Sequence, residues 1–337
     1  MKRNNKIFFI AEAGINHNGS MKNAIKLVDI AAAAGADYVK FQVAKSNLIS
    51  KFAPKAKYQK SSKNSKESQH DMIKKIELDW DEAHIKLKKH CKKRGIKFLT
   101  SAFSLEDAIK VNKLNVNLFK IPSGEITNLP YLRKIAKYNL PIILSTGMAR
   151  IAEIDNCLQI LENSGYDTKK LTILHCNSEY PTPYEDVNLN VISSLRKTFE
   201  LDIGYSDHTM GSEVSIAATA LGATVIEKHL TLDKNMEGPD HKSSLEPEEF
   251  KLMVKQIRSI EKALGSGYKK PTRSEIKNMD IVRKSIVAKK NIKKGDIFNE
   301  KNLAVKRPGT GLSPMIWEKI LGKKAKKNFI IDELITL

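Results

Sequence analysis

The sequence predicts an α/β fold, a (β/α)8 TIM barrel followed by a small β-rich domain. Short apolar runs with strand character alternate eight times with segments of helical spacing, and a helical segment at 246–264 closes the series. No Gly-x-Gly-x-x-Gly motif follows the first run. That absence disfavours the alternative, a doubly wound open sheet that binds a dinucleotide.

The eight predicted strands are rich in β-branched and aromatic residues and are bounded by polar or turn-forming segments. They span residues 7–13, 38–43, 97–103, 118–123, 141–146, 171–176, 202–206 and 224–230. Helix-start signals lie between them, because Ser20, Ser104 and Asn128 can each cap the helical pattern that follows. The segment 211–223, rich in Ala, Val and Ile, fits a crossover helix between parallel neighbours.

The pattern changes after Gly265-Ser-Gly. We predict a barrel domain at 1–267, a polar linker at 268–280 and a second domain at 281–337, in which short strand-like runs recur. A domain of this size has a small core, so we expect it to pack on a barrel.

Composition excludes several classes of protein. The net charge is +20, but the lysines are scattered or paired without interleaved aromatic residues, so we predict no nucleic-acid partner and expect anionic substrates to be attracted. No apolar run reaches the ~18 residues of a membrane span, and the N-terminal pattern does not fit a signal peptide. We expect a cytoplasmic protein with no membrane partner, in which the three cysteines are packed thiols.

Polar side chains are dense at the carboxyl ends of the predicted strands, where barrel active sites lie. In strand order they include Glu12, Lys40, Gln42, Ser101, Lys120, Ser123, Glu125, Ser145, Ser178, Tyr180, Ser206, His208, Glu227 and His229. Any one of them could be an ordinary hydrogen-bonded or solvated side chain. Eight strands that all end this way predict a functional site.

Two neighbouring strands carry the most specific pattern. Side chains alternate faces along a strand, so Ser206 and His208 share one side of the seventh, and Glu227 and His229 share one side of the eighth. The imidazoles should therefore be neighbours. With open coordination positions they suit a divalent ion that polarises a carbonyl; the alternative is two unrelated hydrogen-bonded histidines.

The remaining rim residues suggest what such an ion would act on. Lys40 and Lys120, with Ser101, Ser123, Ser145 and Ser206, form a cationic lining rich in hydrogen-bond donors. Such a lining suits a small molecule that carries phosphate and carboxylate. Glu12 and Glu125 are placed for an outer-shell or proton-transfer role. The combination suggests carbon–carbon bond formation from an enol phosphate.

These residues lie in motifs that resemble the sialic acid synthase family over essentially the whole chain. The motifs are Glu12-Ala-Gly-Ile-Asn-His-Asn-Gly, Lys40-Phe-Gln, Lys120-Ile-Pro-Ser-Gly-Glu, Leu144-Ser-Thr-Gly-Met, Glu179-Tyr-Pro-Thr-Pro, Gly204-Tyr-Ser-Asp-His-Thr, Glu227-Lys-His and Gly238-Pro-Asp-His. Lys306-Arg-Pro-Gly-Thr-Gly resembles the family's antifreeze-like (SAF) domain.

The resemblance implies an enzyme that condenses phosphoenolpyruvate with an N-acylated mannosamine-type sugar and water, in a domain-swapped homodimer. It implies manganese, or alternatively Mg²⁺ or Co²⁺, on His208 and His229. Phosphoenolpyruvate would lie on Lys40, Lys120, Ser123, Ser145 and Ser206. The sugar would contact Gln42, Glu125, Tyr180, Asp240 and, across the dimer, Arg307.

Two features depart from the family pattern. Thr100-Ser-Ala-Phe stands where Ser-Thr-Pro-Phe is common, so a phosphate contact by Ser101 is inferred, and either Asn177 or Ser178 could contact substrate.

The expected activity is that of an N-acetylneuraminate synthase using N-acetylmannosamine. The alternative within the family is an N,N'-diacetyllegionaminate synthase using 2,4-diacetamido-2,4,6-trideoxymannose. Outside the family, two hypotheses compete with these. One is a different phosphoenolpyruvate-using or aldolase-type barrel enzyme, and the second is a non-catalytic sugar- or nucleic-acid-binding protein.

Overall fold

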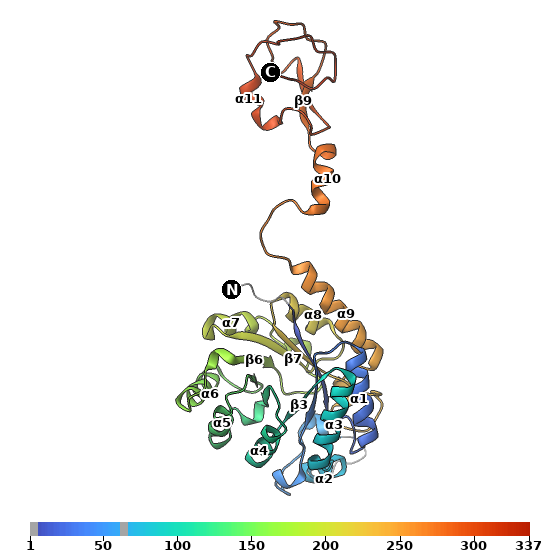
Figure 1. The fold of residues 1–337 in the computed structure, drawn as a ribbon, viewed down its shortest axis with the longest axis vertical. Helices are drawn as coiled ribbons and strands as arrows, with labels where there is room; N and C mark the ends of the chain where they lie inside the picture. The colour runs from blue at the N-terminus through green and yellow to red at the C-terminus, as the bar shows by residue number, and fades with distance from the viewer. Residues whose placement is uncertain (1–5, 61–66) are drawn as a thin grey trace. The chain divides into compact units, whose positions relative to one another are not determined.

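The computed structural model describes residues 6–60 and 67–337, which divide into two compact units, one that ends at Gly265 and one at Ser266–Leu337. In the first unit eight parallel strands close into a barrel in sequence order (Figure 1). They are β1 (Phe8–Gly14), β2 (Tyr38–Gln42), β3 (Lys97–Ser101), β4 (Phe119–Ile121), β5 (Ile142–Ser145), β6 (Leu171–Cys176), β7 (Asp202–Asp207) and β8 (Val225–His229). Pairing of β1 with β8 closes the ring. The predicted barrel is confirmed, and the open sheet is excluded.

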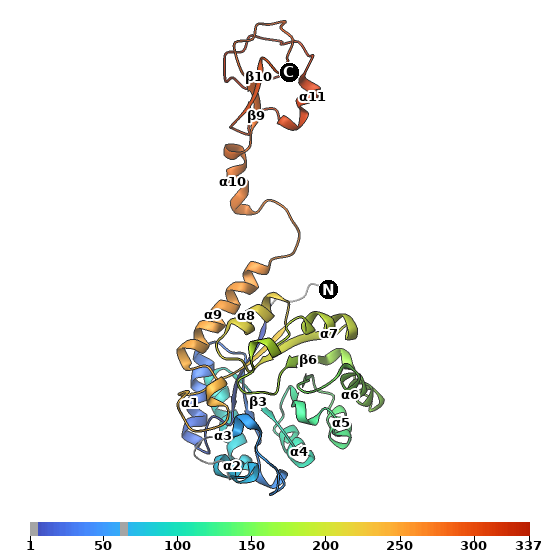
Figure 2. The ribbon, with the colours of Figure 1, turned by 180° about the vertical axis from the view of Figure 1, so that it is seen from behind.

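Helices surround the strands, as Figure 2 shows from behind. They are α1 (Met21–Ala33), α2 (Gln69–Ile76), α3 (Trp80–Arg94), α4 (Leu105–Lys113), α5 (Leu129–Ala136), α6 (Ile151–Asn163), α7 (Val191–Phe199), α8 (Glu213–Ala220) and α9 (Pro247–Leu264). Ser20, Ser104 and Asn128 accept backbone N–H bonds at the starts of α1, α4 and α5, as predicted. Among the helices of the described residues, none is long and apolar enough to cross a membrane.

The strand ends differ slightly from the predicted bounds. The fourth strand, expected at 118–123, ends at Ile121. Pro122 follows and lacks a backbone N–H for the ladder, and Ser123–Glu125 forms a 3-10 turn instead. This turn places Ser123 and Glu125 on the rim of the barrel and not within the strand.

The interior of the barrel changes character along its axis. Near the amino ends of the strands it is filled by an apolar cluster that includes Ile10, Tyr38, Leu99, Leu174 and Val225. Two residues further along β1, β2 and β8, alternation brings Glu12, Lys40 and Glu227 to the same interior. The apolar layer thus supports a charged layer that faces the carboxyl-end rim.

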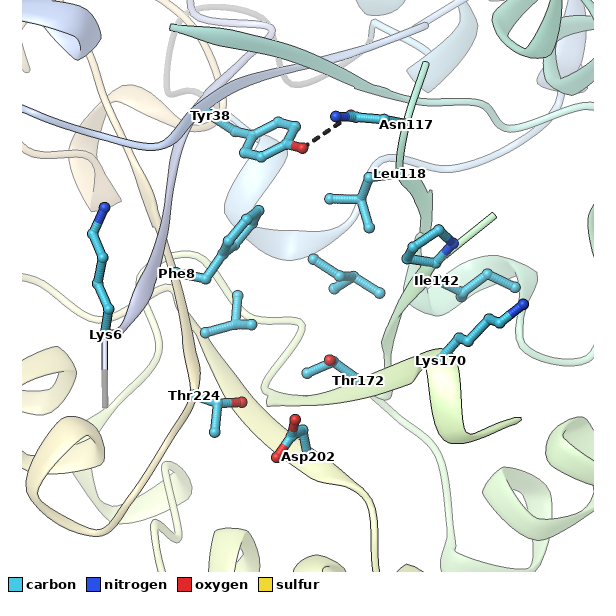
Figure 3. Close-up of a pocket in the computed structure, with 13 residues that line it drawn as sticks. Lys6, Phe8, Tyr38, Asn117, Leu118, Ile142, Lys170, Thr172, Asp202 and Thr224 are labelled. Atoms are coloured by element: carbon cyan, nitrogen blue, oxygen red, sulfur yellow. Dashed lines mark hydrogen bonds between the residues drawn. The ribbon is translucent and has the colours of Figure 1, made fainter. Parts of the chain in front are cut away.

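A cavity of about 460 Å³ lies at the opposite, amino end of the barrel. Figure 3 shows its side chains, including Phe8, Leu118 and Ile142, with Lys6 and Lys170 at its edges. The Tyr38 hydroxyl donates a hydrogen bond to Asn117 Oδ1 at 2.9 Å in this cavity. No residue predicted for the site lines it, so the candidate chemistry belongs to the other end.

The second unit contains α10 (Arg273–Val282), β9 (Ser285–Ala288), β10 (Leu303–Lys306) and α11 (Trp317–Ile320). The strands β9 and β10 pair antiparallel, and Ile286, Phe298 and Phe329 belong to a separate core. Most of the expected linker at 268–280 is helical, because α10 begins at Arg273. The Thr272 side chain and Glu275 form a capping box there, which supports a helix that buries none of its residues.

Two buried histidines predict how stability depends on pH. His17 and His84 pack against Trp80 with ring centroids 5.7 and 5.2 Å away, and burial lowers the pKa of each to about 4. Between pH ~6.5 and ~4 the unfolded chain binds protons that the native state does not. As the pH is lowered through this range, the free energy of unfolding should therefore decrease, by up to about 1.4 kcal/mol per pH unit for each histidine.

The variant His84→Gln lacks one of these titrations. Denaturant unfolding across this pH range should give it a shallower loss of stability than the wild-type chain shows. Equal slopes for the two proteins would contradict the assignment of a neutral, buried His84.

Candidate active site

Four charged side chains form a buried cluster inside the barrel. Lys40 Nζ lies 2.8 Å from Glu12 Oε2 and 3.7 Å from Glu227 Oε1, and Lys120 Nζ lies 3.8 Å from the same Glu227 oxygen. All four side chains are almost completely buried. Two carboxylates thus balance two ammonium groups in a space from which water is largely excluded.

The cluster shifts the protonation equilibria of its members. Burial acts to raise the pKa of Glu227, but Lys120 and Lys40 outweigh it and hold the pKa below its ordinary value. Burial acts to lower the pKa of Lys40, but Glu12 and Glu227 raise it. For Lys120 burial prevails and lowers the pKa, and burial likewise raises the pKa of Glu12. Glu227 is therefore the best stabilised anion of the cluster.

Hydroxyl groups surround the lysines. Lys120 Nζ donates to Ser145 Oγ at 2.6 Å, Lys40 Nζ donates to Ser101 Oγ at 3.3 Å, and Ser206 Oγ donates to Glu227 Oε1 at 3.0 Å. On the rim, the Gly147 N–H donates to Ser123 Oγ at 2.9 Å. The ammonium and hydroxyl groups form a donor set of the kind that binds phosphate or carboxylate.

The two histidines are neighbours, as the strand pattern predicts. Their ring centroids are 5.3 Å apart, and the Tyr180 ring stacks on His208 at 4.1 Å and meets His229 edge-on at 5.6 Å. Burial lowers the pKa of His208 to about 4 and that of His229 well below its ordinary value. Both imidazoles are therefore neutral at physiological pH, which is the form that binds metals.

The surroundings of the imidazoles fit a divalent ion. His208 Nδ1 lies 2.5 Å from the Asn177 carbonyl oxygen, a contact of the kind that orients a metal-binding imidazole, and its Nε2 lies 3.4 Å from Ser206 Oγ. His229 Nδ1 is buried without a hydrogen-bond partner among the described residues and lies 3.9 Å from Asp240 Oδ2. No group of three or more His, Cys, Asp or Glu side chains in residues 6–60 and 67–337 is arranged to hold a metal. The two neutral imidazoles, one of which has an unpartnered buried Nδ1, are nitrogen ligands of the type that a divalent ion accepts.

A second buried pair supports the histidines from the outer face of the barrel. Lys228 Nζ lies 3.2 Å from Asp207 Oδ2, and neither side chain is exposed. Lys228 also donates to the Thr209 carbonyl at 2.6 Å, and Ser215 Oγ donates to Asp207 at 2.6 Å. Each residue of the pair directly precedes a histidine, so the pair ties together the ends of β7 and β8 that carry them.

A cavity of about 360 Å³ opens beside the charged cluster at the carboxyl-end rim. Gln42, Glu125, Tyr180 and Asp240 all line it. Gln42 Nε2 donates to Glu12 Oε1 at 2.7 Å, which joins the cavity to the charged cluster. Burial raises the pKa of Asp240 to about 7, so this carboxyl is suited to proton exchange near neutral pH, and burial also raises the pKa of Glu125.

Ser178 and Arg307, also predicted for the site, are not among the residues that line this cavity. Ser178 is on the rim, where its Oγ would be 2.3 Å from a Cβ added at Gly147. Arg307 is exposed in the second unit and donates from Nε to the Val282 carbonyl at 3.0 Å.

Comparison with known proteins places the sequence in a family. The model of the NeuB family matches residues 27–269, and that of the SAF domain matches residues 283–337. The chain belongs to the NeuB family. It is 56% identical to an N,N'-diacetyllegionaminic acid synthase of Campylobacter jejuni, over 98% of this chain and 99% of that protein.

Two further comparisons also find synthases that are similar to this chain. An N,N'-diacetyllegionaminic acid synthase of Legionella pneumophila is 43% identical over 95% of this chain and 91% of that protein. The crystal structure of the N-acetylneuraminic acid synthetase of Leptospira borgpetersenii, in complex with citrate, is similar with a TM-score of 0.71 and 33% identity. That comparison covers 81% of this chain and 90% of the other.

Sequence reasoning missed part of this NeuB-family site. Tyr58, Gln59 and Gln69 line the cavity from the segment after β2, and the Tyr58 ring lies 4.9 Å from that of Tyr180. The segment has no strand periodicity, so its position over the rim could not be predicted from the side-chain pattern. The Glu227 carboxylate, predicted only to share a face with His229, is the group that bridges both lysines.

A substitution at Gly147 tests the anion site. An added Cβ would lie 2.3 Å from Ser178 Oγ and 2.9 Å from Ser123 Oγ, so Gly147→Ala must displace these hydroxyls. Hydrogen bonds to charged groups contribute about 1.5–3 kcal/mol, so phosphate binding should weaken about tenfold or more. Calorimetric titration with inorganic phosphate measures this change.

Gly124→Ala is the matched control, since a Cβ there meets no atom within 4 Å. It should bind phosphate as the wild-type chain does. If both alanine variants kept wild-type affinity, the rim near Gly147 would not be part of an anion site.

Proposed function

We propose that this NeuB-family chain is a nonulosonic acid synthase that condenses phosphoenolpyruvate with an acylated hexosamine and water. One observation carries the proposal. A buried pair of lysines is balanced by two glutamates, and two neutral histidines pack against Tyr180, which lines the adjoining cavity. The lysines suit a small anion, and the histidines suit a carbonyl compound.

Phosphoenolpyruvate would lie on the lysine side of the site. Lys120 and Lys40 would contact its phosphate and carboxylate, with hydrogen bonds from the hydroxyls of Ser101, Ser123, Ser145 and Ser206. Ammonium groups held in a buried site attract an anion more strongly than ammonium groups in water. Because Glu12 and Glu227 already orient them, little reorganisation is needed on binding.

The sugar would lie in the adjoining cavity. Gln42, Glu125, Tyr180 and Asp240 line it and offer both donors and acceptors to hydroxyl and amide groups. Either Ser178 or Asn177 would add a contact at the rim. In a domain-swapped homodimer, Arg307 of the partner subunit would reach the sugar's acyl group.

The reaction forms a bond between C3 of phosphoenolpyruvate and the aldehyde carbon of the open-chain sugar. Water then adds at C2. The bond between C2 and the bridging oxygen breaks, and phosphate leaves with that oxygen and the bonding electrons to give a nine-carbon 2-keto acid. A divalent ion on His208 and His229, such as Mn²⁺, Mg²⁺ or Co²⁺, would supply Lewis-acid polarisation of the aldehyde oxygen. Glu125, which lines the cavity, would deliver the proton that the new hydroxyl needs, and Glu12 would keep Lys40 and Gln42 in position.

The favoured sugar is 2,4-diacetamido-2,4,6-trideoxymannose, which makes the chain an N,N'-diacetyllegionaminate synthase. The 56% identity over almost all of both chains to a synthase with that name supports this choice. N-acetylmannosamine, expected first from the sequence, remains the second candidate. The similarity to an N-acetylneuraminic acid synthetase structure supports it at 33% identity.

The experiment that tests the proposal supplies purified protein with phosphoenolpyruvate, Mn²⁺ and each sugar in separate reactions. Phosphate release and the mass of the product are measured, with a chelator control. Turnover of the diacetamido sugar that the chelator abolishes is expected. No turnover of either sugar by a folded protein would overturn the proposed function.

Removal of either imidazole should abolish metal-dependent turnover. In His208→Ala and His229→Ala the fold should persist, because each side chain lies at the rim end of its strand and the apolar barrel layer is untouched. Activity should fall by at least a factor of about 100, in line with the loss of an important electrostatic group. Circular dichroism checks the fold, and wild-type activity in either variant would refute the metal assignment.

Complementation in mixed dimers tests the placement of Arg307. An Arg307→Ala chain and a His229→Ala chain are each expected to be nearly inactive alone. If the arginine acts across the dimer, a hybrid contains one site with both wild-type residues, so mixing and exchanging the chains should restore activity. Failure of exchanged hybrids to recover activity would place the arginine in the same chain as its histidines.

A further inference from the structure

The cavity beside the charged cluster has one strongly apolar wall. Leu48, Ile49 and Ile73 line it from the segment between β2 and α3, and Ile15 and Phe103 extend the wall from the ends of β1 and β3. Ile15 and Ile73 are buried, whereas Leu48 is 41% exposed.

The rest of the molecule holds this wall in place. Trp80 Nε1 donates to the Ala44 carbonyl at 3.2 Å, and Ser46 donates from its N–H and its hydroxyl to Glu77 Oε2 at 3.2 and 2.9 Å. Lys45 forms an ion pair with Asp107 on α4. These contacts fix the chain immediately before Leu48 and Ile49, so the wall is formed before a ligand arrives.

Polar side chains line the remainder of the cavity. Gln42 bonds to Glu12 of the charged cluster, Asp240 lies 3.9 Å from His229, and Tyr58 packs beside Tyr180. Gln59 Nε2 lies 3.5 Å from the Tyr58 hydroxyl, and Gln69 Nε2 donates to Gln59 Oε1 at 3.3 Å. A ligand that fills the cavity therefore meets both hydrogen-bonding and apolar side chains.

We propose that the apolar wall of Leu48, Ile49, Ile73, Ile15 and Phe103 determines sugar specificity by covering methyl groups of the substrate. In 2,4-diacetamido-2,4,6-trideoxymannose these are C6 and the methyl of the C4 acetamido group. The inference rests on the proposed function. It assigns the wall a substrate class, a 6-deoxy sugar with a second acyl group.

The competing sugar fits this wall less well. N-acetylmannosamine carries hydroxyl groups at both C4 and C6, and these would leave water without gaining a partner on the wall. Hydrophobic pockets reject an added hydroxyl only weakly, by a factor of roughly 100. The wild-type protein should therefore favour the diacetamido sugar in kcat/KM by about 10- to 100-fold, and still turn over the other slowly.

The test measures kcat/KM for both sugars in Leu48→Asn and Ile73→Asn. An amide on the wall offers hydrogen bonds to hydroxyl groups and leaves methyl groups less well covered. The ratio of the two kcat/KM values should fall about tenfold or more in each variant, since each loses apolar contact with the favoured sugar. Leu48 is partly exposed, so its variant tests the wall even if Ile73→Asn loses stability.

Phe52→Asn is the matched control. Phe52 belongs to the same segment and is 95% exposed, but it does not line the cavity. The ratio of the two kcat/KM values in this variant should equal that of the wild-type protein. The thermal unfolding midpoint of each variant verifies that the compared proteins are folded.

Two different failures can be distinguished. If the wild-type protein consumes neither sugar, the proposed function is wrong, and this inference falls with it. If the wild-type protein is active but Leu48→Asn has the same ratio as Phe52→Asn, the synthase remains and the apolar wall is not its specificity determinant.

Discussion

The ion-pair cluster of Glu12, Lys40, Lys120 and Glu227 is the interaction on which the candidate site depends. Either lysine alone in the barrel interior would carry a large desolvation cost. The two carboxylates offset that cost, and Glu227 does so for both lysines at once. Two ammonium groups are thereby fixed beside the rim, where an anionic substrate can use them.

The barrel separates stability from chemistry along its axis. The apolar layer around Ile10, Leu99 and Leu174 fills the interior near the amino ends of the strands, and charged groups replace it two residues further along. One continuous barrel can therefore tolerate neutral histidines and raised carboxyl pKa values at its rim. The segment after β2 then adds an apolar wall to a site that is otherwise polar.

Much of this arrangement could be predicted from the sequence, because strands have a side-chain period of two. That period assigned His208 to the face of Ser206 and His229 to the face of Glu227. It could not show that Glu227 meets both lysines, since that contact exists only once the barrel closes and brings β2, β4 and β8 around one axis. The helix α10 was missed because its capping box lies in a polar stretch with no buried face, and the cavity wall around Leu48 follows no regular period.

The central claim is that this site joins an enol phosphate to an aldehyde and releases phosphate by breaking the C–O bond. The most direct test uses phosphoenolpyruvate with ¹⁸O at the bridging position between C2 and phosphorus, together with the diacetamido sugar. Mass spectrometry should find the label in the released phosphate and none in the nine-carbon acid. Label retained in the acid, or consumption of phosphoenolpyruvate without such a product, would contradict the account.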